Sequence, residues 1–413
     1  MWTRTRSTAS AIALLALPAL AGGNPGNVVV VTNTDPAAFV AAAQDGDTLL
    51  FPPGNYGSMV ISGKSLTLAA DVGGAVNVGT VLVNNLASDQ QVTLSGLNIS
   101  APSTSIPLRL ENNAGKVWVQ DGNLNSSTST LSGTPVTASL VNCADVVFAR
   151  CVLLGGAQPN DGASSGGHAL VMTASNASAF DCEFTGGPGL SNFFISSLDP
   201  GEGGNALRMA GGTFFASGCS FTGGNGGIGA LAVSGGSCGD GAAGGDALFL
   251  FAADPIARLK DCTLTGGIGG DAQTEPCVKG PDGQGASVLS GQQIDLPGTA
   301  RTLTIPNPVR EGETAQLAFA GEPGDLVFLV VALDQASTFN PLLGQDVTAD
   351  PFFLLPMGTA GPTGLLNVPI LISDFANPAR DSILLREQGF FVSSSLELIL
   401  DGAQSVLHLD SSF

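Results

Sequence analysis

A short phrase recurs in the middle of the chain and limits what the chain can fold into. Four copies, at 150–156, 181–187, 218–224 and 261–267, contain a cysteine, an apolar residue two positions later and a Gly-Gly pair. Two degenerate copies, 96–99 and 121–124, precede them. Alignment gives two columns: Leu97, Gly122, Cys151, Cys182, Cys219 and Cys262, then Ile99, Leu124, Leu153, Phe184, Phe221 and Leu264. Positions two apart share one face of a strand, so both columns are predicted to point inward.

A second phrase, Gly-x-Ala-Leu, lies upstream of the later copies at 167–170, 204–207 and 245–248. The distance from its alanine to the next cysteine is nearly constant: 13 residues from Ala169 to Cys182 and from Ala206 to Cys219, and 15 from Ala247 to Cys262. The length varies mainly after the Gly-Gly pair, where the additional residues are mostly Gly, Ser, Ala and Asp. A constant core with insertions at one corner predicts a solenoid of stacked coils.

The segment before these repeats carries a resemblance to a known family. A strand at 28–32 is followed by a predicted helix, with Asp35 as N-cap and Pro36 as its first residue, running to about Gln44. The phrase at 46–56, Gly-Asp-Thr-Leu-Leu-Phe-Pro-Pro-Gly-Asn-Tyr, resembles the opening of pectate-lyase-like domains, in which the helix covers the end of the core. Residues 28–298 therefore resemble a right-handed parallel β-helix. A leucine-rich repeat is disfavoured because its leucine phrase does not recur.

The two ends of the chain differ from the repeats. Residues 1–21 read as a signal peptide, with Arg4 and Arg6 before a short apolar stretch and a cleavage site at 19–21, which predicts a secreted or cell-surface protein. An uncleaved anchor is the alternative. Residues 22–298 are assigned to the β-helix with its capping helix. About eight strands separated by turns in 299–413 predict a small antiparallel β-sandwich. Its simplest role is to cover the C-terminal end of the solenoid, and carbohydrate binding or surface attachment is the alternative.

Charge restricts the partners. The formal charge is −20, and it becomes about −22 without the signal peptide, because 34 acids then face 14 − 2 = 12 bases. Such a surface repels nucleic acid, anionic lipid and strongly anionic polysaccharide. The expected partners are extracellular polysaccharide or cell-surface components, with no nucleic acid and no membrane span after signal cleavage.

The cysteines and the acidic loops raise the question of crosslinks and metals. Cys238 and Cys277 lie in loops of successive coils and are predicted to form a disulfide. Zinc is disfavoured because the chain has no C-x-x-C pair and two histidines. No cofactor is expected, and calcium is the alternative, because acidic residues stand among glycines in the loops: Asp199, Glu202, Asp240, Asp271, Glu275 and Asp282.

A polar column at the start of one strand supplies the candidate site. It consists of Thr137, His168, Asn205 and Asp246, and Arg208 follows Asn205 on the same strand. His168, Arg208 and Asp246 are candidates for acid–base catalysis, and Asn205 and Asp246 for binding sugar hydroxyls. The alternative is a hydrogen-bonded ladder at a corner of the solenoid. A second outward column is predicted to alternate charge between coils: Asp121, Arg150, Asp181, Gly218 and Asp261.

The resemblance implies catalytic groups that this sequence lacks as phrases. Pectate-lyase-like enzymes use clustered aspartates with calcium and a basic residue, and polygalacturonase-like enzymes use aspartates with a histidine and Arg-x-Lys. Here 258–260 matches only the Arg-x-Lys spacing. The predicted function is therefore an exported, non-catalytic surface, structural or glycan-binding role. The alternative is a polysaccharide lyase or glycoside hydrolase with a diverged site.

Overall fold

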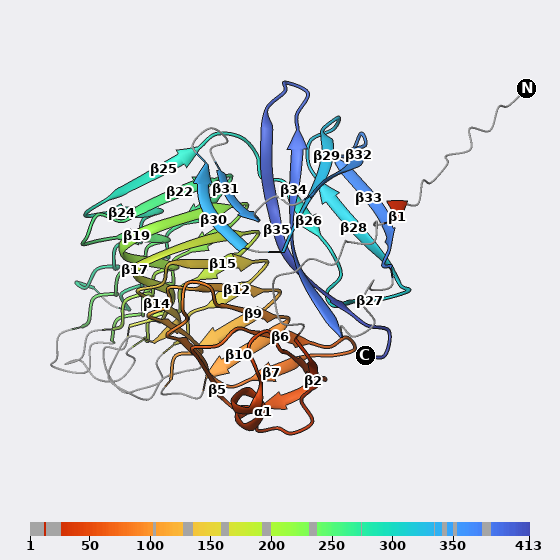
Figure 1. Cartoon of the computed structure of the whole chain (residues 1–413). Coiled ribbons are helices and arrows are strands. Elements are labelled where there is room, and N and C mark those ends of the chain that lie inside the picture. The colour runs from red at the N-terminus through yellow and green to blue at the C-terminus, as the bar shows by residue number, and fades with distance from the viewer. Residues whose placement is uncertain are drawn as a thin grey trace, which may run out of the picture.

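The computed structural model describes residues 12–13, 26–101, 105–126, 135–157, 165–191, 200–230, 238–273, 275–333, 335–340, 345–349, 353–373 and 381–413. Within them the protein is almost entirely β-strand, with one short helix, α1 (Ala37–Ala42). From residue 28 to residue 296, all strand pairings are parallel. Figure 1 shows these strands stacked from α1 upward and the C-terminal sheets standing beside them.

The parallel strands form three ladders, and the chain passes through them in the same order in successive coils. The first ladder contains β5 (Met59–Ser62), β8 (Val81–Asn84), β11 (Leu108–Glu111), β14 (Val136–Val141), the first halves of β17 (His168–Phe180) and β19 (Leu207–Ser217), β21 (Leu248–Leu250) and β24 (Ala286–Val288). The second contains β2 (Val28–Val30), β3 (Thr48–Phe51), β6 (Leu66–Ala70), β9 (Gln91–Ser95), β12 (Lys116–Gln120), β15 (Asp145–Ala149), the second halves of β17 and β19, β22 (Ile256–Lys260) and β25 (Gln292–Leu296).

The third ladder is a separate eight-stranded sheet. It contains β4 (Gly54–Tyr56), β7 (Val76–Val78), β10 (Leu97–Ala101), β13 (Asn123–Ser126), β16 (Val152–Leu154), β18 (Glu183–Thr185), β20 (Ser220–Thr222) and β23 (Thr263–Thr265). Its register confirms the second predicted column, because the paired residues are Ile99, Leu124, Leu153, Phe184, Phe221 and Leu264, in that order.

The cysteine column also points inward, as predicted. Cys151, Cys182 and Cys219 are buried. The backbone N–H of Cys151 donates to Cys182 Sγ at 3.3 Å, and that of Cys182 donates to Cys219 Sγ at 3.4 Å. Beside them, the rings of Phe184 and Phe221 stack with centroids 4.8 Å apart. The repeated phrase therefore builds a continuous core, in which each coil buries its apolar side chains against the next.

The second outward column occupies a turn rather than a strand face. Its residues have positive φ: Asp121 +53°, Arg150 +50°, Asp181 +52°, Gly218 +65° and Asp261 +49°. This left-handed conformation favours Gly, Asn and Asp, which explains the composition of the column. The predicted alternation of charge is present once, where the Arg150 guanidinium donates to both carboxylate oxygens of Asp121 at 2.8 and 2.9 Å.

Helix α1 covers the N-terminal end of the core, where Val40 is buried. Its first residue is Ala37, whose N–H donates to Asp35 Oδ1 at 3.1 Å. It ends at Ala42, two residues before the predicted end. Asp47, the aspartate of the Gly-Asp-Thr phrase, accepts the backbone N–H of Asn27 at 2.9 Å and of Gln44 at 2.7 Å. That phrase therefore ties the helix to the first coil.

The C-terminal strands form two main sheets, antiparallel in most pairings, that share one buried cluster. One sheet contains β26 (Thr302–Thr304), β28 (Thr314–Ala320), β33 (Leu365–Leu371) and β1 (Ile12–Ala13). The other contains β27 (Val309–Arg310), β29 (Leu326–Ala332), β32 (Phe353–Thr359), β34 (Ser382–Val392) and β35 (Leu398–Leu409), and β30 (Gln335–Asn340) pairs with β31 (Gln345–Ala349). Apart from β1, the predicted signal peptide lies outside the described residues.

The C-terminal sheets pack along the flank of the second ladder, so the prediction that they cover the C-terminal end is wrong. Outward apolar side chains of β12, β15, β17 and β19 form a cluster with Ala403 of β35: Trp118, Val147, Phe180 and Phe215. Gln120 and Ser405 exchange two hydrogen bonds of 2.7 Å across this contact. An apolar outer face needs cover, and this requirement places the sheets at the side (Figure 1).

Candidate functional site

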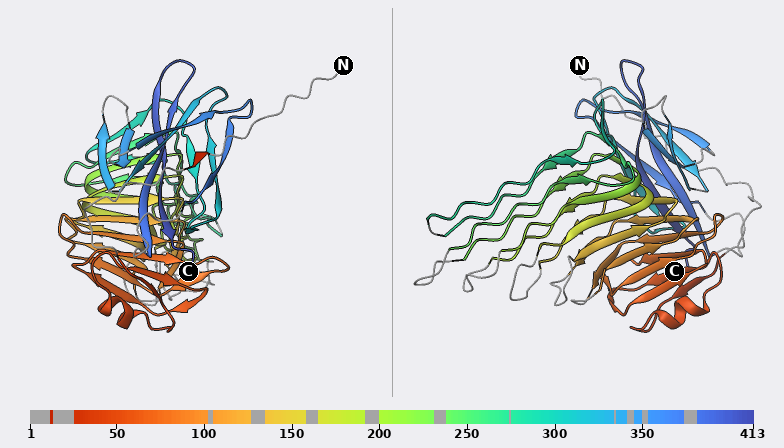
Figure 2. Two further views of the ribbon diagram at one scale, coloured as in Figure 1. Left: turned by 45° about the vertical axis from the view of Figure 1, so that its right-hand side comes forward. Right: turned by 90° about the vertical axis from the view of Figure 1, so that its left-hand side faces the viewer.

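The insertions after the Gly-Gly pairs form extended arms that lie side by side. The outgoing arms are 185–191, 222–230 and 265–271, and the returning arms are 200–205, 238–246 and 276–284. We call these six segments the glycine arms. Figure 2 shows the chain at this corner extending away from the stack in parallel runs. In the outgoing arms two buried glycines alternate with one more exposed residue, such as Pro188, Asn225 or Ile268. This three-residue period matches the three residues per turn of a polyproline II helix.

Backbone hydrogen bonds join the glycine arms into a lattice. Gly204 N–H donates to Gly187 O, Gly224 to Gly204, Gly245 to Gly224 and Gly267 to Gly245, at 2.7–2.8 Å. Each bond connects an outgoing arm to a returning one. A Cβ atom at Gly224 would lie 1.9 Å from Gly187 O, so the arms approach closely enough to exclude a side chain. The insertions are therefore ordered structure rather than loops with mere reach.

Crosslinks between the arms use several of the acidic residues considered for calcium. Cys238 and Cys277 form a disulfide between returning arms of neighbouring coils, with a Cα–Cα distance of 5.9 Å. Asp240 Oδ1 accepts the N–H of Val278 at 2.8 Å, and Asp282 Oδ1 accepts the N–H of Gly269 at 2.8 Å. Asp199 lies outside the described residues. Across the described parts of the chain, no three His, Cys, Asp or Glu side chains gather as a metal site.

The polar column forms a ladder in which each side chain binds the backbone of the next coil. His168 Nδ1 accepts the N–H of Asn205 at 2.9 Å, and Asn205 Oδ1 accepts the N–H of Asp246 at 2.9 Å. Asp246 Oδ1 in turn accepts the N–H of Gln284 at 2.7 Å. The structure brings these three residues together where the returning glycine arms meet the first ladder. One acceptor atom of each is thereby committed to holding successive coils in register.

Thr137 does not belong to this column. Val136 is the residue paired with His168, and Ala138 pairs with Leu170 rather than with Ala169. The buried Thr137 hydroxyl instead lies against Ser126 Oγ at 2.9 Å. The constant spacing of 13 was misleading because the pairing offset changes within the coil: it is 32 residues from Val141 to Thr173 and 31 from Val146 to Ala177. The following coil is one residue shorter at that corner.

His168 is placed poorly for proton transfer. It is 9 % exposed, and burial together with the neighbouring Arg208 lowers its pKa to about 4. Because Nδ1 accepts a backbone N–H, the neutral ring carries its proton on Nε2. Nε2 lies 3.4 Å from Arg208 Nη1, which is also a donor. The imidazole therefore has no free lone pair with which to act as a general base at neutral pH.

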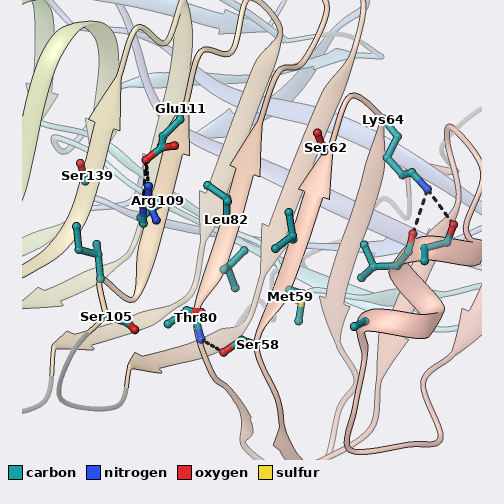
Figure 3. A pocket seen from close by; sticks show the side chains of 16 residues that line it. Ser58, Met59, Ser62, Lys64, Thr80, Leu82, Ser105, Arg109, Glu111 and Ser139 are labelled. Atoms are coloured by element: carbon teal, nitrogen blue, oxygen red, sulfur yellow. Dashed lines mark hydrogen bonds and ion pairs between the residues drawn. The ribbon is translucent and has the colours of Figure 1, made fainter.

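A groove that the sequence analysis missed lies on the outer face of the first ladder (Figure 3). It has a volume of about 850 Å³ and runs between α1 and β14. Hydroxyl groups alternate there with apolar side chains, and two basic residues are already engaged: Lys64 donates to the carbonyls of Val40 and Ala43, and Arg109 Nε donates to Glu111 at 2.9 Å. The lining includes Ser58, Ser62, Thr80, Leu82 and Ser139. Strand alternation predicts that these residues point outward, but not that they share a hollow.

One outward column of the first ladder connects the groove with Arg208. Its paired residues, in order, are Val60, Leu82, Arg109, Ser139, Val171, Arg208, Phe249 and Ser287. With about 4.8 Å between strands, the column spans roughly 34 Å. It offers apolar, hydroxyl, cationic and aromatic groups along one continuous face, which suits recognition of an extended ligand.

Comparison with known proteins adds no identity: no protein-family model matches the sequence, and no curated protein is similar to it. No helix in the described part of the chain is long and apolar enough to cross a membrane. The functional argument therefore depends on the residues themselves.

Proposed function

We propose that this chain is an exported right-handed parallel β-helix, spanning 22–298 and followed by a C-terminal β-sandwich at 299–413, with a non-catalytic extracellular role in glycan binding or surface structure. One observation carries the non-catalytic part. His168, Asn205 and Asp246, the most conspicuous polar residues of the sequence, each use an acceptor atom to hold the backbone of the next coil. A catalytic acid or base needs such an atom for the substrate.

The groove and the outward column support the binding part of the proposal. Sugar rings present hydroxyl edges and apolar faces, and the groove combines serine and threonine hydroxyls with Leu82 and with Val60, which is 56 % exposed. A neutral or weakly charged polysaccharide fits best, because the protein carries a formal charge of −20. The proposed ligand chain lies along the column, across the strands of the first ladder.

A combined binding and turnover screen tests the proposal. The protein is incubated with a panel of extracellular polysaccharides, with and without calcium, and both retention on the polymer and release of sugar ends are measured. We expect retention without release of reducing or unsaturated ends. Leu82→Trp, which fills the groove, should weaken retention by at least about 10-fold, while Ser287→Trp, at the far end of the same column, should not. Calcium-dependent release of sugar ends that is abolished by Arg208→Ala or His168→Ala would establish an enzyme instead.

A further inference from the structure

His168 and Arg208 direct two N–H donors at each other with no acceptor between them. The Nδ1 atom of His168 accepts the N–H of Asn205, so the proton of the neutral ring is on Nε2. That nitrogen lies 3.4 Å from Arg208 Nη1, which carries only donor hydrogens. The contact cannot be a hydrogen bond between these two groups. It is the arrangement that two donors adopt when they share a third group as their acceptor.

The rest of Arg208 also lacks a polar partner. Its Nε atom is buried without a hydrogen bond, and the described residues place no carboxylate in an ion pair with it. By contrast, Arg109, Arg150 and Arg310 each pair with a carboxylate. Leaving the donor of a charged group unsatisfied is costly, so an arginine in this position is expected to have an anionic partner.

Aromatic rings hold the guanidinium in place. Its central carbon lies 4.5 Å from the ring centroid of Phe251 and 5.8 Å from that of Phe249, on the next coil. The His168 ring is fixed independently, through its bond to the backbone of Asn205. Both donors are therefore positioned before any ligand arrives, which reduces the entropy lost on binding.

We propose that His168 and Arg208 form a binding site for a single oxyanion group, a carboxylate or a sulfate, carried by an otherwise neutral ligand. Two donors 3.4 Å apart suit the paired oxygens of such a group. The formal charge of −20 excludes a densely charged polyanion and leaves room for one acidic group. The site is separate from the groove, and it stands even if the protein binds no polysaccharide.

Titration of the ¹⁵N-labelled protein with small anions tests the site. Sodium acetate, sodium sulfate and sodium glucuronate are added at constant ionic strength, with glucose as the uncharged match to glucuronate, and the His168 Nε2 and Arg208 Nε signals are followed. We expect saturable shifts with at least one anion and none with glucose. Shifts with all three anions assign a general oxyanion site, and shifts with glucuronate alone assign a sugar acid.

Matched variants separate the site from the scaffold. His168→Asn keeps an acceptor for the N–H of Asn205, as Asn205 itself provides for Asp246, but it removes the Nε2 donor. We expect this variant to fold normally and to bind the anion about 5-fold more weakly, and Arg208→Gln to weaken binding by about 10-fold or more. Arg109→Gln, in the same outward column, should leave binding unchanged. The absence of any saturable anion shift, or binding that survives in Arg208→Gln, would refute the site.

Discussion

Gly224→Ala is expected to break the lattice of glycine arms, with a loss of about 4 kcal/mol or more in the stability of that region. The added Cβ would lie 1.9 Å from Gly187 O and 2.6 Å from its carbonyl carbon, and both atoms are backbone. Neither can move without displacing a neighbouring arm. The bonds from Gly224 to Gly204 and from Gly245 to Gly224 would be lost together.

Hydrogen exchange of the arm amides measures this effect directly. In Gly224→Ala the amides of 222–230 and 238–246 should exchange rapidly while the core strands stay protected. Asn225→Ala is the matched control, because Asn225 is exposed and the change costs only its bond to the Ile268 N–H, about 1 kcal/mol. If both variants exchange alike, the arms are not held together as described.

Asp181→Asn is expected to stabilise the protein at alkaline pH. Burial and the neighbouring Asp401 carboxylate raise the pKa of Asp181 to about 8. The ordinary value is 3.8, so the folded state binds more protons than the unfolded state between these two values. The contribution of Asp181 to stability is therefore complete below about pH 4 and is lost as the pH rises through 8. At pH 9 the substitution should add about 4 kcal/mol, allowing for the partial exposure of the side chain.

Denaturant unfolding of both proteins between pH 4 and pH 9 checks this sign. The difference in the free energy of unfolding between Asp181→Asn and the parent should grow with pH. Asp261→Asn, at the same turn position two coils further on, serves as the control, because Asp261 is exposed and its carboxylate accepts the N–H of Ala300. Its effect should be independent of pH in this range. A constant difference for Asp181→Asn would show that the residue is not buried beside Asp401.

The repeated columns could be predicted because a strand repeats every two residues. Phe184 and Phe221 align by sequence and pair in the third ladder, since their shared phrase fixes both the face and the register. Thr137 fails the same alignment because a single residue is lost at a corner, beyond the reach of spacing between fixed motifs. The side-on position of the C-terminal sheets depends on the outward faces of Trp118 and Phe215, which resemble core residues in a sequence.

The glycine arms and the candidate site were hidden for different reasons. Glycine counted over the whole chain shows no triplet period, but 222–230 and 265–271 carry one locally, and this signal was readable. The polar column was found from sequence, yet its use was not. Whether His168 offers a lone pair to a substrate depends on the tautomer, and the tautomer depends on a backbone N–H from a residue 37 positions away.

The protonation of His168 tests the central claim, that the polar column is scaffold rather than acid–base machinery. The chain has two histidines, so long-range ¹H–¹⁵N spectra contain two rings, and His168→Asn assigns them. The account predicts a neutral His168 ring with its proton on Nε2 throughout pH 5.5 to 8.5, and titration only at about pH 4. A ring that carries its proton on Nδ1, or that titrates between pH 6 and 7, would contradict it, because either result frees a nitrogen for proton transfer.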